Sequence, residues 1–216
     1  MIAVICVLTA LINLQAHSAT VVLTSRHGQK DGNFGYSVSG IPDVNGDARG
    51  DVVVGAPFED VVSVVAGRAY VFDGANGIWL RTLRSPGNEP FGLFGASVAG
   101  IPDANANGQG NVIVGAPEED PDSSPERAGR AYIFDGTSGL LIYTLVSPNE
   151  ISVGRFGSCV SGVPDVNGDG RGDVVVGADS EEVETFQSVG LAGRAYIFDG
   201  VTGNLLHTLV SPNASF

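Results

Sequence analysis

The sequence FGYSVSGIPDVNGDARGDVVVGAP at residues 34–57 decides the interpretation of this chain, because it returns twice. The later copies are FGASVAGIPDANANGQGNVIVGAP at residues 94–117 and FGSCVSGVPDVNGDGRGDVVVGAD at residues 156–179. All three copies align without gaps. Self-similarity at a nearly fixed period is typical of repeat architectures, in which each unit buries its apolar surface against its neighbours.

A second block follows each copy, with the sequence AGRAYVFDG or AGRAYIFDG, at residues 66–74, 128–136 and 192–200. It leads to TLRSP or TLVSP at residues 82–86, 144–148 and 208–212. Only the connection between the two blocks changes in length, and it covers residues 58–65, 118–127 and 180–191. Length variation confined to one connection is typical of a surface loop.

Each repeat predicts four β-strands. The first begins at Phe34, Phe94 or Phe156, and the second is the β-branched run at residues 52–54, 112–114 or 174–176. The third covers residues 69–72, 131–134 or 195–198, and the fourth covers residues 80–83, 142–145 or 206–209. Repeated units of four strands, apolar on both faces, describe the stacked blades of a β-propeller. We therefore expect an all-β fold with blades at residues 34–93, 94–155 and 156–216.

These residues resemble the FG-GAP repeat of the integrin alpha-subunit propeller. The Phe-Gly pairs stand at residues 34–35, 94–95 and 156–157, and Gly-Ala-Pro stands at residues 55–57 and 115–117, with Asp179 in place of the third proline. The resemblance implies a closed ring of seven blades, of which three are present. We therefore expect an incomplete or open ring that meets further blades or associates with itself, because exposed apolar faces and unpaired strand edges favour assembly.

The loop between the first two strands carries the chemistry of a cation site. DVNGDARGD at residues 43–51 and DVNGDGRGD at residues 165–173 place carboxylate or amide oxygens at positions 1, 3, 5 and 9. Hard oxygen ligands at alternate positions are the arrangement that Ca²⁺ prefers, and the resemblance also implies calcium in this hairpin. With a backbone carbonyl at position 7, the candidate ligands are Asp43, Asn45, Asp47, Arg49 and Asp51 in one loop, and Asp165, Asn167, Asp169, Arg171 and Asp173 in the other.

The middle loop, DANANGQGN at residues 103–111, carries a formal charge of -1 against -3 in the other two, so weaker calcium binding is expected there. The alternative for all three loops is a hydrogen-bonded Asx-turn hairpin without metal. Arg-Gly-Asp occurs at residues 49–51 and 171–173. We interpret both tripeptides as part of the loop structure and not as recognition motifs.

Composition limits the partners of the chain. Asp plus Glu number 24 against 11 Lys plus Arg, which gives a net charge of -13. This balance disfavours nucleic acid and anionic membranes, which are bound by clusters of basic residues. The variable acidic loops predict a site for a protein or other extracellular ligand, and the alternative is a solvated acidic rim. With only Cys6 and Cys159 there is no disulfide framework, and we expect Cys159 to be a buried, unreactive thiol.

Residues 1–19 are predicted to be a signal peptide, because an apolar run ends in the small residues AHSA at residues 16–19. The alternative is a buried N-terminal strand. The run is too short to span a membrane, which takes about 20 residues. Residues 20–33 are expected to form a lone N-terminal strand and linker. This pattern favours a secreted or cell-surface protein.

The favoured function is a secreted, calcium-binding, non-enzymatic module for adhesion or protein interaction. The alternative is the non-catalytic propeller portion of a larger extracellular enzyme, either a hydrolase or a quinoprotein-like dehydrogenase. The segment DGTSGLLIYTL at residues 135–145 weakly resembles the repeat of quinone-dependent dehydrogenases, but Leu141 stands where that repeat has tryptophan.

Overall fold

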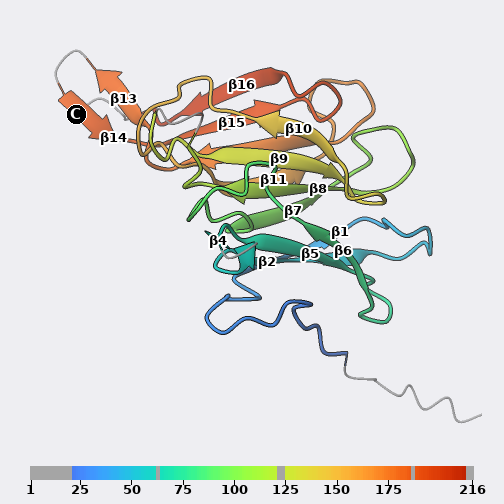
Figure 1. The fold of residues 1–216 in the computed structure, drawn as a ribbon. Helices are drawn as coiled ribbons and strands as arrows, with labels where there is room; N and C mark the ends of the chain where they lie inside the picture. The colour runs from blue at the N-terminus through green and yellow to red at the C-terminus, as the bar shows by residue number, and fades with distance from the viewer. Residues whose placement is uncertain (1–20, 62–63, 121–124, 186–187, 213–216) are drawn as a thin grey trace, which may run out of the picture.

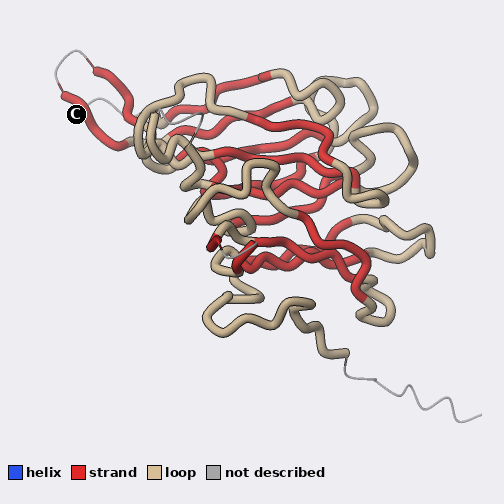
Figure 2. Tube along the Cα trace, viewed as in Figure 1, coloured by secondary structure: helices blue, strands red, loops and turns tan. Residues whose placement is uncertain are grey.

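The computed structural model describes residues 21–61, 64–120, 125–185 and 188–212, so the predicted signal peptide lies outside it. The described part of the chain contains sixteen strands and no helix, and therefore no helix that could cross a membrane. Figures 1 and 2 show the strands gathered into sheets that are stacked one on another. The predicted all-β class is confirmed.

Three antiparallel sheets of four strands correspond to the three repeats. The first contains β1 (Ser37–Ile41), β2 (Asp51–Ala56), β5 (Arg68–Phe72) and β6 (Trp79–Leu83). The second contains β7 (Ser97–Ile101), β8 (Asn111–Ala116), β9 (Arg130–Asp135) and β10 (Leu141–Leu145). The third contains β11 (Phe156–Val163), β12 (Asp173–Ala178), β15 (Arg194–Phe198) and β16 (Leu205–Val210). We call them blades 1, 2 and 3.

Two small hairpins lie outside the blades. They are formed by β3 (Asp60–Val61) with β4 (Val64–Val65), and by β13 (Glu182–Thr185) with β14 (Ser188–Leu191). Both belong to the connection of variable length, between the second and third strands of a blade. Figure 1 shows β4 and the β13–β14 hairpin at the same end of the stacked sheets.

Adjacent blades share an apolar core. Between blades 1 and 2, one blade contributes Val53, Val71 and Leu83, and the other contributes Phe94 and Phe134. An equivalent core joins blades 2 and 3. At each junction the phenylalanine of the Phe-Gly pair forms a parallel bridge to the preceding blade, Phe94 to Gly67 and Phe156 to Gly129. The blades thus stack as in a β-propeller, and the stack forms an open ring.

Two predictions about the first strands of the blades need correction, one about where they begin and one about the burial of Cys159. In blades 1 and 2 the first strand begins at Ser37 and Ser97, three residues later than expected. In all three blades the glycine of the Phe-Gly pair has a φ near 90°, which interrupts regular strand pairing, and only in blade 3 does the strand continue across the interruption, as a bulge between Phe156 and Cys159. Cys159 is exposed in β11 and not buried as expected, because no described residue covers that part of blade 3.

The expected lone strand in residues 20–33 is also wrong for the described residues 21–33, none of which lies in a strand. The segment runs irregularly along blade 1, where Leu23 packs against the cluster around Tyr70 and Phe72. A β-strand needs a hydrogen-bonding neighbour, and the described chain provides none for this segment.

Candidate functional site

The blades place two kinds of loop at opposite ends of the molecule. The loops predicted to bind calcium join the first two strands of each blade, and the variable loops join the second and third. Because these strands are antiparallel, successive connections emerge at opposite ends. In Figure 1 the calcium-loop end is on the right and the variable-loop end is on the left.

The first predicted calcium loop is held by a chain of side-chain to backbone hydrogen bonds. The Asp43 carboxylate accepts from the N–H groups of Asn45 (3.0 Å) and Gly46 (2.7 Å) through Oδ1 and from that of Ala48 (2.6 Å) through Oδ2. Asn45 Oδ1 accepts from the N–H of Asp47, and Asp47 Oδ1 accepts from that of Arg49. Desolvation raises the pKa of Asp43, but these N–H donors outweigh it and the pKa lies below its usual value.

The third repeat reproduces this geometry. Asp165 accepts from the N–H groups of Gly170 (2.7 Å) and Gly168 (2.6 Å), which lower the pKa of its carboxyl group. Asn167 Oδ1 accepts from the N–H of Asp169, and Asp169 Oδ1 accepts from that of Arg171. Both loops therefore present exposed oxygens on a backbone bent by Asx turns.

The aspartate at position 9 is turned inward in both loops. Asp51 is 2% exposed, and its carboxylate accepts from the N–H groups of Val44 (2.8 Å) and Gly74 (3.0 Å). Burial raises the pKa of this carboxyl group. Asp173 is 0% exposed and bonds Val166 and Gly200 in the same way. These buried carboxylates join the loop to the turn after the third strand, so neither Arg-Gly-Asp tripeptide offers its carboxylate at the surface.

The middle loop is neutralised by its neighbours. The Asp103 carboxylate pairs with the guanidinium group of Arg171, from the loop of blade 3, at 2.6 Å. The side-chain amides of Asn105 and Asn107 both donate to Asp135 Oδ2. At position 9, Asn111 Oδ1 accepts from the N–H of Ala104, but its Nδ2 is buried without a partner. The single carboxylate of this loop is therefore paired with a cation of the protein through Oδ2, while its Oδ1 is buried without a hydrogen-bond partner among the described residues.

The structure does not gather the other predicted ligands into a finished cation site. Among the described residues, no group of three or more carboxylate, imidazole or thiol side chains converges as metal ligands would. In the first loop Asp43, Asn45 and Asp47 lie along one exposed turn, while Asp51 lies beneath it. The donor chemistry of the first and third loops fits Ca²⁺, because it consists of carboxylate, amide and carbonyl oxygens.

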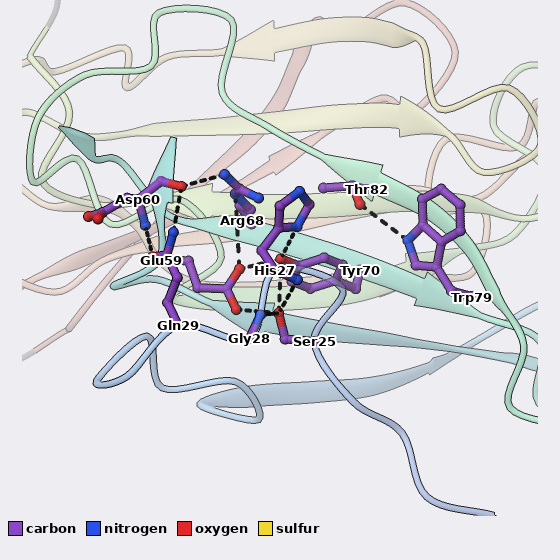
Figure 3. Close-up of polar contacts among 10 residues, drawn as sticks. All are labelled: Ser25, His27, Gly28, Gln29, Glu59, Asp60, Arg68, Tyr70, Trp79 and Thr82. Atoms are coloured by element: carbon purple, nitrogen blue, oxygen red, sulfur yellow. Dashed lines mark hydrogen bonds and ion pairs between the residues drawn. The ribbon is translucent and has the colours of Figure 1, made fainter. Parts of the chain in front are cut away.

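A buried carboxylate at each blade is a feature that the sequence analysis missed. Glu59, Glu119 and Glu181 are almost fully buried, and each accepts a hydrogen bond from a tyrosine hydroxyl of the same blade. The tyrosines are Tyr70, Tyr132 and Tyr196. Figure 3 shows the cluster in blade 1, where Ser25 donates to Glu59 and the guanidinium group of Arg68 lies beside it.

The serine in each cluster comes from the chain before that blade: Ser85 and Ser147 from the preceding repeat, and Ser25 from the N-terminal segment. Ser25, Ser85 and Ser147 stand 34 residues before the corresponding glutamate, and Ser147 donates to Glu181. Constant spacing was the available signal, but these glutamates lie in loops that we interpreted as a ligand site or, alternatively, as a solvated acidic rim. Burial raises the pKa of Glu119 to about 7, and burial with the bond to Glu59 raises that of Tyr70 to about 12. Ser147 therefore links blades 2 and 3 through a charge-assisted hydrogen bond to Glu181, whereas Ser85 reaches the cluster of blade 2 through the Tyr132 hydroxyl at 3.5 Å.

At the variable-loop end, charged residues connect one blade to the next. The guanidinium group of Arg155 lies 3.1 Å from Glu118 of the middle variable loop and 3.2 Å from Asp179 of blade 3. A groove of about 530 Å³ lies at the same end, between the segment at residues 29–31 and the first variable loop. It is lined by Gln29, Lys30, Asp31, Phe58, Asp60, Val65 and Phe91. This end combines acidic loops with exposed aromatic rings.

Comparisons with known proteins agree with the fold. The FG-GAP repeat family matches residues 34–72 and 156–198. Integrin alpha-2 of Bos taurus is 34% identical over 185 residues, which is 81% of this chain and 15% of that protein. Integrin alpha-IIb of Mus musculus is 33% identical over 165 residues, 70% of this chain and 15% of that protein.

Integrin alpha-11 of Homo sapiens is 31% identical over 183 residues, which is 75% of this chain and 15% of that protein. The chain thus corresponds to about 15% of the length of these relatives. Its repeats, its stacked four-stranded blades and these matches lead to one conclusion. The chain is an FG-GAP repeat protein that resembles the N-terminal β-propeller of integrin alpha subunits.

Proposed function

We propose that this chain is a non-enzymatic module for adhesion or protein interaction that works outside the cell. The observation that carries the proposal is its likeness to integrin alpha subunits over 70 to 81% of its length. The residue composition is consistent, since the net charge of -13 suits neither nucleic acid nor anionic membranes. The apolar run before residue 20 supports export.

Calcium is the cofactor of this proposal. The loops at residues 43–51 and 165–173 would hold it through the carboxylates and amides at positions 1, 3 and 5, with the carbonyl at position 7. A bound Ca²⁺ would neutralise the clustered carboxylates and cross-link each loop. Asp51 and Asp173 would support the loops from beneath through their bonds to backbone N–H groups.

The ligand surface of the proposal is the variable-loop end. Its support is the groove between Lys30 and Phe58, together with the exposed side chain of Phe91. Aromatic rings at a polar surface supply contact area with little loss of conformational entropy, which suits an interface with a protein.

The test measures binding of the purified chain to immobilised extracellular-matrix proteins in millimolar calcium. Phe58→Ala and Phe91→Ala should weaken binding by roughly tenfold each, because both remove aromatic contacts at the variable-loop end. Leu140→Ala is the matched control, since Leu140 is exposed in the turn at residues 136–140, at the opposite end. Loss of binding in Leu140→Ala alone, or the absence of binding to every matrix protein, would contradict the proposal.

A further inference from the structure

Blade 3 presents to solvent the face that blades 1 and 2 bury against the next blade. Leu83 and Leu145 are both 2% exposed in the shared cores, whereas Leu209 at the same position of blade 3 is 47% exposed. Val166 is exposed where Val44 and Ala104 are buried. A groove of about 470 Å³ runs along this face, lined in part by Cys159, Gly177, Ala195 and Leu209. We call it the forward face of blade 3.

Blade 1 presents the opposite half of the same interface. Val98 and Val160, on the first strands of blades 2 and 3, pack in the cores shared with the preceding blade and are 7% and 8% exposed to solvent. The equivalent Val38 of blade 1 is 65% exposed. Phe34 is partly exposed, while Phe94 and Phe156 are fully buried. We call this the rear face of blade 1. The chain forms this interface twice internally. Within the described residues, the forward face of blade 3 and the rear face of blade 1 are the two halves of a third such interface, and both are only partly covered.

The glycines show how closely the two halves fit. A Cβ atom on Gly55 would lie 2.0 Å from the carbonyl oxygen of Gly95, and one on Gly115 would lie 2.0 Å from that of Gly157. At the equivalent Gly177, the nearest atom to a Cβ would be Cys159 Cβ at 3.5 Å, an ordinary contact. The place that the Phe-Gly carbonyl occupies at the first two blades is therefore open at the third.

The rear face shows the same contrast. A Cβ on Gly100 would lie 2.7 Å from Ile41 Cα, and one on Gly162 would lie 2.0 Å from the carbonyl oxygen of Gly100. A Cβ on Gly40, the equivalent of these two in blade 1, would meet nothing within 4 Å. Gly40 and Gly177 thus lie at open positions on the two complementary faces.

We propose that the forward face of blade 3 binds the rear face of blade 1 of a second copy of this chain. The contact continues an interface already formed twice within the molecule, with Phe34-Gly35 of the second copy taking the role of Phe94-Gly95. The interface is heterologous, because two different surfaces meet, so it leads to a closed ring or to a longer head-to-tail assembly.

The segment at residues 21–25 competes with this contact. Leu23 and Ser25 occupy on blade 1 the places that Leu83 and Ser85 of blade 1 take on blade 2. In the proposed assembly Leu209 and Ser211 of the neighbouring copy replace them. Because an intramolecular segment has a high effective concentration, it weakens the contact between copies, which therefore requires a high protein concentration.

The experiment uses the steric contrast at the two glycines. Gly40→Ala and Gly177→Ala are accommodated in the single chain, but each places a methyl group where the docked neighbour's backbone would lie. Sedimentation velocity from about 5 to about 200 µM should show the mean mass of the wild type rising, and each variant should associate at least roughly tenfold more weakly. Gly87→Ala is the control, since its Cβ would meet only Ser85 Oγ at 3.9 Å.

Mixing the two variants gives the decisive result. Gly40→Ala retains an intact forward face and Gly177→Ala retains an intact rear face, so the mixture should form a complex of two chains and nothing larger. A wild type that remains monomeric throughout overturns the proposal. Association that both variants retain, or a mixture that does not complement, also overturns it.

Discussion

The tyrosine hydroxyl in each buried cluster matters because its partner is a carboxylate that water does not reach. Tyr132 donates to Glu119, which is 3% exposed, and Glu119 Oε1 has no hydrogen-bond partner within the described structure. Removing the tyrosine hydroxyl would leave this carboxylate more poorly satisfied. An unsatisfied buried polar group costs more than a typical hydrogen bond contributes.

Tyr132→Phe should therefore lower the free energy of unfolding by about 2 kcal/mol, measured by urea denaturation at neutral pH. Tyr36→Phe is the control, because Tyr36 is exposed and its loss of a hydroxyl should change little. Equal stabilities for the two variants would show that the buried bond to Glu119 contributes nothing.

Glu119 also gives the stability of the chain a defined pH dependence. Burial raises its pKa from 4.5 to about 7 in the folded chain, so the folded state retains a proton that the unfolded state loses as the pH rises from about 4.5 to about 7. The stability from this group is fully present below pH 4.5 and is lost through pH 7. The loss is at most about 3 kcal/mol.

Glu119→Gln should remove this dependence. The difference in free energy of unfolding between the variant and the wild type, measured by urea denaturation from about pH 5 to about pH 8, should change across the window and level off above pH 7. Glu126→Gln changes an exposed glutamate of the same loop and should leave the wild-type profile unaltered. A profile for Glu119→Gln parallel to that of the wild type would contradict the assignment.

At the scale of the element, the calcium loops should differ in their response to the ion. If each site binds with a dissociation constant of ~0.1 mM in ~2 mM calcium, binding stabilises the chain by about 2 kcal/mol per site. Asp47→Ala and Asp169→Ala should therefore lower the melting temperature in calcium and much less in chelator. Asn107→Ala, in the loop neutralised by Arg171, should show no calcium-dependent loss. Equal calcium-dependent losses in all three variants would reject this ranking of the loops.

Sequence patterns predicted the strands better than the contacts between repeats. The runs at residues 52–54, 112–114 and 174–176 lie inside β2, β8 and β12, because short β-branched runs bounded by glycine suit buried strands. The first strands were extended too far in blades 1 and 2, since the pattern does not encode the positive φ at the Phe-Gly glycine, which ends regular pairing there but is bridged by a bulge in blade 3.

The candidate site was predictable only in part for a related reason. Alternating oxygen-bearing residues indicated the loops at residues 43–51 and 165–173, but not that Asp51 and Asp173 lie beneath them and bond Gly74 and Gly200. Those bonds join residues that are 23 and 27 positions apart. The buried Glu119 was missed for the same reason, since its partner Tyr132 lies 13 positions away and the serine that reaches this cluster, Ser85, belongs to the preceding repeat.

At the scale of the whole molecule, the blades should unfold together. Leu145 lies in the core between blades 2 and 3, while Trp79, the only tryptophan, lies in blade 1. Because the shared cores link all three blades, a cavity in one core should destabilise the whole stack.

Leu145→Ala should lower the free energy of unfolding by roughly 2 to 5 kcal/mol, with coincident transitions in circular dichroism and Trp79 fluorescence. The neighbouring Val146→Ala removes exposed methyl groups and should have little effect. A fluorescence transition that stays at the wild-type midpoint while the dichroism shifts would mean that blade 1 unfolds independently.

Each repeat contributes a serine to the buried cluster of the next repeat, and this arrangement affects how such a protein can change length during evolution. A duplicated gene segment encoding residues 34–93 would carry Ser85 for the glutamate that follows it and would place its own Glu59 after the serine that precedes it. Every new junction would therefore reproduce an existing one. Recombination between whole repeats can add or remove a blade without leaving a buried carboxylate that lacks its serine.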